Sequence, residues 1–171
     1  MRYFIVFLFL VTSVFNAEAQ LRHIKGINGT GLNWGLTRYG KVIELEYVHF
    51  FTNKLYLSSR ATYEYGRYSP ALIRFSSIGL INTVYYTIVS AREKFYLSTG
   101  GGLSLFFDKA RESEVPLSDA IPFGIHASIQ GEYYVANQLS FYLDYTQHYL
   151  FIEPKWGAGR WTISLGFRVY F

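Results

Sequence analysis

Apolar side chains occupy every second position in eight separate segments of this chain. The final segment, 161–171, shows the pattern most clearly, since its odd positions are apolar and its even positions from 162 to 168 are polar or small. A period of two is typical of a β-strand with one apolar face. The segments are residues 30–36, 43–47, 55–65, 78–88, 95–107, 123–133, 139–145 and 161–171. Asn82, in the fourth segment, is a polar residue at a position where the pattern predicts an apolar one.

The connections between these segments alternate in length. Three are short: 52–54, 90–94 and 136–138. Three are longer: 67–74, 108–122 and 152–159. Only the first hairpin, near 38–41, breaks the alternation. Short turns at one end, longer loops at the other and an even strand number are typical of outer-membrane barrels, whereas a soluble sandwich gives no reason for such parity. We therefore predict an all-β fold, an eight-stranded antiparallel up-and-down transmembrane barrel in the bacterial outer membrane.

Composition agrees with a lipid-facing surface. Aromatic residues make up 20% of the chain and charged residues only 16%, against a usual charged share of about 25%. Tyrosine, with 16 copies, suits interfaces where a ring meets both lipid and water. The formal net charge is +4 without a Lys/Arg cluster, so we expect no direct nucleic-acid binding.

The N-terminus has the features of a signal peptide. Arg2 precedes an apolar run at 3–15, and Ala17-Glu18-Ala19 fits a signal-peptidase site. The run is shorter than the roughly 20 residues of a spanning helix. We predict a signal peptide over 1–19 and a single barrel domain over 20–171. The chain has no cysteine, which excludes a lipoprotein anchor and a disulfide scaffold.

The polar faces of the segments predict a filled lumen. An eight-stranded barrel is just wide enough inside for side chains, and buried charges are tolerated when they are paired. If the short turn at 52–54 joins two strands, Glu46 lies opposite Arg60; a last loop centred on Trp156 places Asp144 opposite Arg168. We expect a plug of side chains instead of a pore. The predicted lumen network is Glu44, Glu46, Arg60, Glu64, Glu132, Asp144 and Arg168.

The remaining motifs give no reason to expect a cofactor. The TGGG run at 99–102 lies inside a strand pattern and lacks the Lys-Ser/Thr of a phosphate-binding loop. The histidines have no shared ligand spacing, so we expect no metal site. The charged stretch 108–119 is either a solvated loop or a partner-docking loop. The histidines are His23, His49, His126 and His148.

One enzymatic alternative rests on a short motif. His126-Ala127-Ser128 resembles the His-x-Ser element of outer-membrane lipid A deacylases, in which a histidine oriented by a glutamate activates the serine. Glu132 is the nearest acid. In that family the catalytic face lies against lipid, whereas the alternation here turns His126 and Ser128 into the lumen. Ile129 also stands where the family motif has Asn.

A second resemblance extends from Gly26 to Phe171. The runs GINGTGLNWG, EKFYLSTGGGLSLFF, FGIHASIQGEYYVANQLSFYLDYTQHYL and GRWTISLGFRVYF are similar, in order and spacing, to the conjugative-transposon TraO family. The resemblance implies a structural or docking component of the type IV secretion apparatus that transfers mobile DNA. It implies other conjugation proteins as partners and no catalytic residues. The first hairpin and the loop at 108–122 differ in length from the family pattern.

The last residue is aromatic, and apolar residues precede it at every second position. Outer-membrane barrels resemble one another in this ending, which implies recognition by the barrel assembly machinery. We predict an assembly signal formed by Phe171, Val169 and Phe167. A further alternative is a small adhesion or envelope barrel, whose function resides in the three longer loops.

Overall fold

The computed structural model describes residues 23–68, 73–92, 94–110, 120–152 and 157–171. Within these ranges no helix is long and apolar enough to cross a membrane. The described residues form eight strands that close into a barrel in chain order. Their bounds are β1 (Asn28–Thr37), β2 (Gly40–Phe50), β3 (Leu55–Tyr68), β4 (Ile73–Ala91), β5 (Phe95–Ala110), β6 (Phe123–Ala136), β7 (Leu139–Ile152) and β8 (Gly159–Tyr170).

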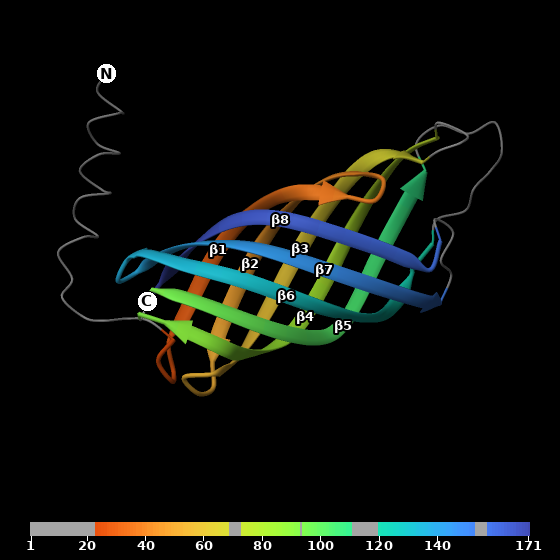
Figure 1. Ribbon diagram of the computed structural model, residues 1–171. Helices are drawn as coiled ribbons and strands as arrows, with labels where there is room; N and C mark the ends of the chain where they lie inside the picture. Colours follow the sequence, from red (N-terminus) through yellow and green to blue (C-terminus); the bar gives the residue numbers. More distant parts are fainter. Residues whose placement is uncertain (1–22, 69–72, 93, 111–119, 153–156) are drawn as a thin grey trace, which may run out of the picture.

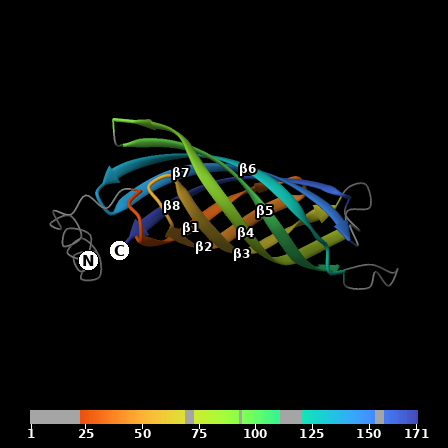
Figure 2. The ribbon, with the colours of Figure 1, turned by 90° about the horizontal axis from the view of Figure 1, so that it is seen from below.

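Each strand pairs antiparallel with the next, and β8 closes the barrel by pairing with β1. In the closing pair Gly31 lies opposite Arg168 and Leu32 lies opposite Phe167. Figure 1 and Figure 2 show the strands wrapping around one elongated tube at a pronounced tilt. Closure removes every exposed strand edge. The predicted eight-stranded antiparallel barrel is confirmed.

The two ends of the barrel differ in their connections. The C-terminus and the start of β1 lie at one end, together with the turns β2–β3, β4–β5 and β6–β7 (Figure 1). We call this the turn end. The opposite end, the loop end, carries the β1–β2 hairpin and the connections that follow β3, β5 and β7. In outer-membrane barrels short turns face the periplasm and longer loops face outward.

The burial of side chains is the reverse of that in a soluble protein. Leu143 and Leu103, on the outer face, are 55% and 53% exposed, whereas the inward-facing Arg168 is fully buried. The same alternation runs along β6, where every second side chain is buried. An apolar exterior around a polar interior is the arrangement expected of a barrel surrounded by lipid.

The first hairpin is tight because its backbone N–H groups find a hydrogen-bond acceptor within the hairpin. The Thr37 hydroxyl accepts hydrogen bonds from the backbone N–H groups of Gly40, at 3.0 Å, and of Tyr39, at 3.3 Å. Gly40 pairs with Gly66 on β3, where a Cβ on either glycine would lie within 2.7 Å of the other's Cα. Any larger residue at this point would push β2 away from β3.

The register of β7 against β8 corrects one prediction. Asp144 lies opposite Ser164, and Arg168 lies opposite Ser140. The predicted facing pair of Asp144 and Arg168 is therefore wrong. Tyr149 pairs with Gly159, so the two strands meet about a point two residues before Trp156. The residue at the centre of a connection cannot be predicted from its length, because one flanking strand can extend further into that stretch than the other.

Other predictions meet the structure in different ways. Glu46 and Arg60 are paired across β2 and β3, as the short turn predicts. The run 99–102 lies within β5. The predicted signal peptide, 1–19, and residues 111–119 of the charged loop lie outside the described residues.

Candidate functional site

Charged side chains fill the interior of the barrel. All seven residues predicted for the lumen network point inward and are at most 4% exposed. They come from β2, β3, β6, β7 and β8. Because a buried charge is stable only when it is paired and hydrogen-bonded, the contacts of the arginines decide how this interior is built.

Arg60 is at the centre of the first cluster. Its Nη1 donates to Asp144 Oδ1 at 2.9 Å and lies 3.5 Å from Glu44 Oε2. Asp144 also accepts hydrogen bonds from the Tyr85 hydroxyl at 2.6 Å and the Thr146 hydroxyl at 2.7 Å. Arg60 thus crosses the lumen to β7, although Glu46 stands directly opposite it on the neighbouring strand.

Arg168 holds the second cluster, toward the turn end. Its Nη2 donates to Glu46 Oε2 at 2.8 Å, and its Nη1 donates to Glu132 Oε2 at 3.2 Å. The guanidinium carbon lies 4.3 Å from the centroid of the Tyr142 ring, a cation–π distance. The Tyr142 hydroxyl contacts Glu46 as well. One arginine therefore links β2, β6 and β8 across the lumen.

Arg160 forms a third cluster that the sequence analysis missed. Both of its terminal nitrogens donate to the Asp108 carboxylate, and Nη1 lies 3.9 Å from Glu64 Oε2. The Arg160 side chain also lies over the Phe106 ring, with its guanidinium carbon 5.2 Å from the centroid. Asp108 was assigned to a loop, but β5 continues to Ala110. The even position of Arg160 in the last strand was the available signal.

Acidic groups outnumber arginines among the buried residues described: six carboxylates face three guanidinium groups. Hydroxyl donors satisfy part of this surplus. Ser58 donates to Glu46 at 2.5 Å, Thr37 donates to Glu64, and Ser140 and Tyr170 both donate to Glu132. The hydroxyl groups thus complete the pairing of carboxylates within the three clusters.

His23 closes the turn end of the lumen. Its side chain is 3% exposed and stacks on Tyr96, with ring centroids 3.9 Å apart. The rings of Phe50 and Tyr56 lie 4.6 and 5.6 Å away. Its Nε2 lies 3.1 Å from Glu132 Oε2, and its Nδ1 lies 3.2 Å from Thr87 Oγ1. The segment before β1 is thereby folded into the barrel mouth.

Little empty space is left near the loop end of the network. A cavity bordered by Glu44, Glu64 and Arg160 has a volume of about 10 Å³. A single buried water requires at least about 10–15 Å³. Side chains thus fill the lumen at this level.

Comparisons with known proteins identify the fold. No protein-family model matches the sequence, and no curated protein matches it. Among solved structures, outer membrane protein OprG from Pseudomonas aeruginosa is similar with a TM-score of 0.63 and 11% identity, over 90% of this chain and 99% of that one. Ail, the attachment invasion locus protein of Yersinia pestis, gives 0.60 and 10%, over 86% and 100%. The outer membrane enzyme PagL gives 0.50 and 14%, over 82% and 98%.

The fold is that of an outer-membrane β-barrel. At these identities the likeness concerns the fold alone. The apolar outer face independently requires a lipid environment, because exposed apolar side chains encircle the barrel on every strand. The outer-membrane barrel therefore resides in the bacterial outer membrane, as predicted.

The His126-Ser128 motif of this outer-membrane barrel does not form a nucleophile–base pair. His126 Nε2 lies 2.8 Å from Thr83 Oγ1, and its Nδ1 lies 2.8 Å from Ser104 Oγ. Ser128 Oγ instead lies 2.8 Å from Thr146 Oγ1. Both residues are buried in the lumen, at 6% and 4% exposure. An activated serine needs a hydrogen bond to the histidine and access to its substrate, and this geometry provides neither.

The C-terminal residues of the barrel face lipid. Phe167 and Phe171 are 39% and 62% exposed on the outer face of the last strand and just after it, and Val169 lies between them on the same face. The Phe171 backbone exchanges hydrogen bonds with Asn28, at 2.9 and 3.2 Å. The predicted assembly residues therefore form a continuous outward row at the seam that closes the barrel.

Proposed function

We propose that this outer-membrane barrel is a non-catalytic envelope protein that acts by binding partners at its loop end. The observation that carries the proposal is the bridged lumen: three arginines contact carboxylates across the interior at 2.8–3.2 Å or in direct contact, and the cavity beside Arg160 has a volume of only about 10 Å³. A barrel without an open path offers water-exposed surface only at its ends. In such folds binding residues are commonly found on loops held by a rigid scaffold.

Attachment is one activity that this fold serves elsewhere. Ail is, by its name, an attachment invasion locus protein. The two longest connections of the present chain follow β5 and β7 and belong to the same end of the barrel, whereas the connection after β3 is no longer than the β2–β3 turn, because β3 and β4 extend further than their apolar patterns. Long connections at one end are the arrangement that a binding function uses. These two points support the proposed role as a binding envelope barrel.

A narrower form of the proposal names the partners. The resemblance to the TraO family supports docking to other proteins of a conjugative transfer apparatus. This resemblance rests on the sequence runs between Gly26 and Phe171 and not on the residues of any described site.

The lipid A deacylase alternative receives less support. PagL shows that the fold can carry an enzyme, but in this chain His126 contacts Thr83 and Ser104 in place of Ser128. Ser128→Ala is expected to leave the lipid A acyl pattern of the membrane unchanged.

One strain set separates these functions. A deletion strain is compared with a strain in which residues 111–119 are replaced by a Gly/Ser segment of equal length. Both are scored for attachment to surfaces and for conjugative transfer, and membrane levels of the barrel are measured in parallel. Loss of attachment with normal transfer supports the envelope role; loss of transfer supports the conjugation partners. An altered lipid A pattern in the deletion strain, with attachment and transfer intact, would overturn the proposal.

A further inference from the structure

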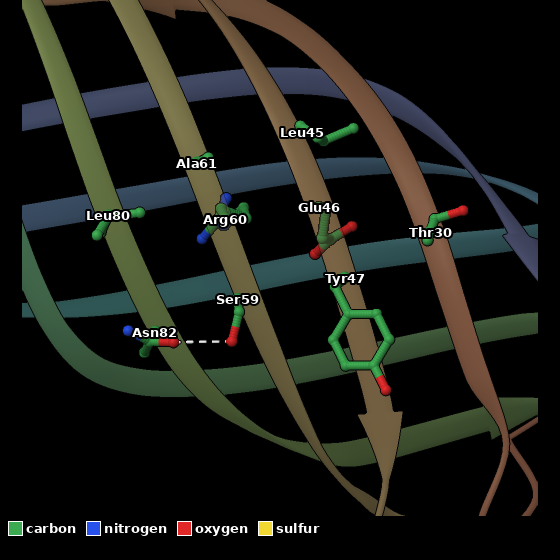
Figure 3. A pocket seen from close by; sticks show the side chains of 9 residues that line it. All are labelled: Thr30, Leu45, Glu46, Tyr47, Ser59, Arg60, Ala61, Leu80 and Asn82. Carbon is green, nitrogen blue, oxygen red and sulfur yellow. Dashed lines mark hydrogen bonds between the residues drawn. The ribbon is translucent and has the colours of Figure 1, made fainter.

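A hollow of about 460 Å³ lies on the lipid-facing wall over β3 (Figure 3). Its floor is formed by the small side chains of Ser59 and Ala61. Larger residues flank them in register: Leu45 and Tyr47 on β2, and Leu80 and Asn82 on β4. The hollow exists because two small residues follow each other on the outer face of one strand.

Asn82 brings a polar group into this apolar wall. It is the middle residue of the 19-residue β4, and the next outward residues on either side are Leu80 and Val84. Ser59 Oγ donates to Asn82 Oδ1 at 2.7 Å, as the dashed line in Figure 3 marks. Among the described residues this is the one hydrogen bond of the Asn82 side chain. The two donors of its amide nitrogen therefore lie without a partner within the described chain, on the outer face between Leu80 and Val84.

The chemistry of this position selects a protein over a lipid. An amide without a partner in hydrocarbon costs free energy, because the bilayer core offers no water to replace the hydrogen bond. The hydrocarbon of an acyl chain would fill the hollow but carries no hydrogen-bond acceptor. The occupant must combine an apolar body with a hydrogen-bond acceptor at the level of Asn82.

A second copy of the chain meets both requirements. Two copies inserted in the same direction are related by a two-fold axis along the membrane normal, so a patch on one faces the same patch on the other at equal depth. An asparagine amide is both donor and acceptor, and is thus complementary to itself. Asn82 and Ser59 of one copy would meet the same residues of the other.

The surface shape is also complementary to itself. Leu80 lines the hollow and stands out from β4 at 50% exposure, and Val84, two residues beyond Asn82 on the same face, is 47% exposed. A two-fold axis in front of the boundary between β3 and β4 brings the β4 side chains at the level of Asn82 in each copy over the β3 hollow of the other, at the point where the tilted strands of the two copies cross. We propose that the chain forms a parallel dimer in the membrane through the outer faces of β3 and β4, with Asn82 at its centre.

The absence of cysteine makes the dimer directly testable. Two copies with tags of different size are produced together, one carrying Leu80→Cys and the other Ala61→Cys, and membranes are mildly oxidised. Disulfide-linked heterodimers are expected. The matched control replaces Ala61→Cys with Leu143→Cys, which lies on the outer face of β7 and should give only background cross-linking.

Asn82→Leu, added to both copies, tests the hydrogen bonds. Polar contacts between membrane segments contribute about 0.6–2 kcal/mol, so the dimerisation constant should fall about 3- to 30-fold. Heat-dependent gel mobility should show the variant folded as well as the parent, because a polar group leaves the lipid face. The proposal would be overturned if the Leu80→Cys/Leu143→Cys control cross-linked as well as the Leu80→Cys/Ala61→Cys pair. A cross-linked product whose mass differs from that of a dimer, or a yield that Asn82→Leu leaves unchanged, would also overturn it.

Discussion

His23 and Glu132 are 109 positions apart in the chain, and His23 Nε2 lies 3.1 Å from the Glu132 carboxylate. The contact joins the segment before β1 to β6 across the turn end of the lumen. Glu132 is also an ion-pair partner of Arg168. The element that closes the barrel mouth is therefore tied directly to the charged network inside.

Removal of the His23 ring should loosen this closure. His23→Ala leaves a space between Tyr96, Phe50 and Tyr56 and takes one partner from Glu132, which we expect to cost about 1–3 kcal/mol of unfolding free energy. Added imidazole should restore part of the loss by occupying the same space. Urea unfolding in lipid vesicles measures both effects.

His49→Ala serves as the matched control for this test. The His49 ring is bonded to Asn28 near the end of β2, on the outer side of the barrel. Its loss should cost less than that of His23 and should not respond to imidazole. Equal losses of unfolding free energy in the two variants, without any effect of imidazole on His23→Ala, would argue against closure of the turn end by His23.

Arg168 should be the most sensitive residue of the lumen. Arg168→Met removes the partner of Glu46 and Glu132 together, and breaking a buried ion pair from one side typically costs about 3–5 kcal/mol. Combining it with Glu46→Gln and Glu132→Gln should recover much of the loss, because no charge then remains unpaired. Unfolding midpoints of the single and triple variants provide the comparison. A triple variant less stable than the single one would contradict this reading.

Gly166 makes room for Asn33 across the closing pair of strands. A Cβ at Gly166 would lie 2.2 Å from Asn33 Oδ1, and Asn33 is held in place by its hydrogen bond to Glu44 at 2.9 Å. Gly166→Ala is expected to destabilise the barrel by about 1–3 kcal/mol. Asn33→Ala should relieve the clash, so the double variant should lose less than the sum of the two single losses. Strict additivity in thermal unfolding would count against the steric explanation.

The C-terminal aromatic residue should matter for assembly. Phe171→Asp places a charge on the outward row that includes Phe167, where it would face lipid. Export should continue, whereas the amount of folded protein in the outer membrane should fall. Quantitative blotting of periplasmic and outer-membrane fractions measures this, with Phe171→Tyr as the conservative control. Normal outer-membrane levels of Phe171→Asp would show that the residue is no assembly signal.

The face of each side chain could be predicted from the sequence because strand geometry alone determines it. A period of two assigned Glu44, Arg60 and Arg168 to the lumen, and the structure buries all three. Parity of the connections likewise indicated which turns share an end. Both inferences need only local pattern and strand order.

The partners within the lumen could not be predicted in the same way. Arg60 lies in register with Glu46 but pairs with Asp144 on the far side, because its long side chain reaches across a narrow barrel. The Asp108–Arg160 pair was missed since β5 extends further than its apolar pattern. His23 precedes the first strand, so no alternating pattern is present from which its burial could be predicted. Such contacts depend on closure in three dimensions, which strand alternation does not encode.

Ion conductance of the purified barrel in planar lipid bilayers tests most directly whether the lumen is filled. The ion pairs of Arg60, Arg160 and Arg168 bridge the lumen at three levels, so the protein should insert without producing sustained current steps. Stable, repeatable unitary currents from protein shown to be folded by its heat-dependent gel mobility would contradict a filled lumen and, with it, a function confined to the ends of the barrel.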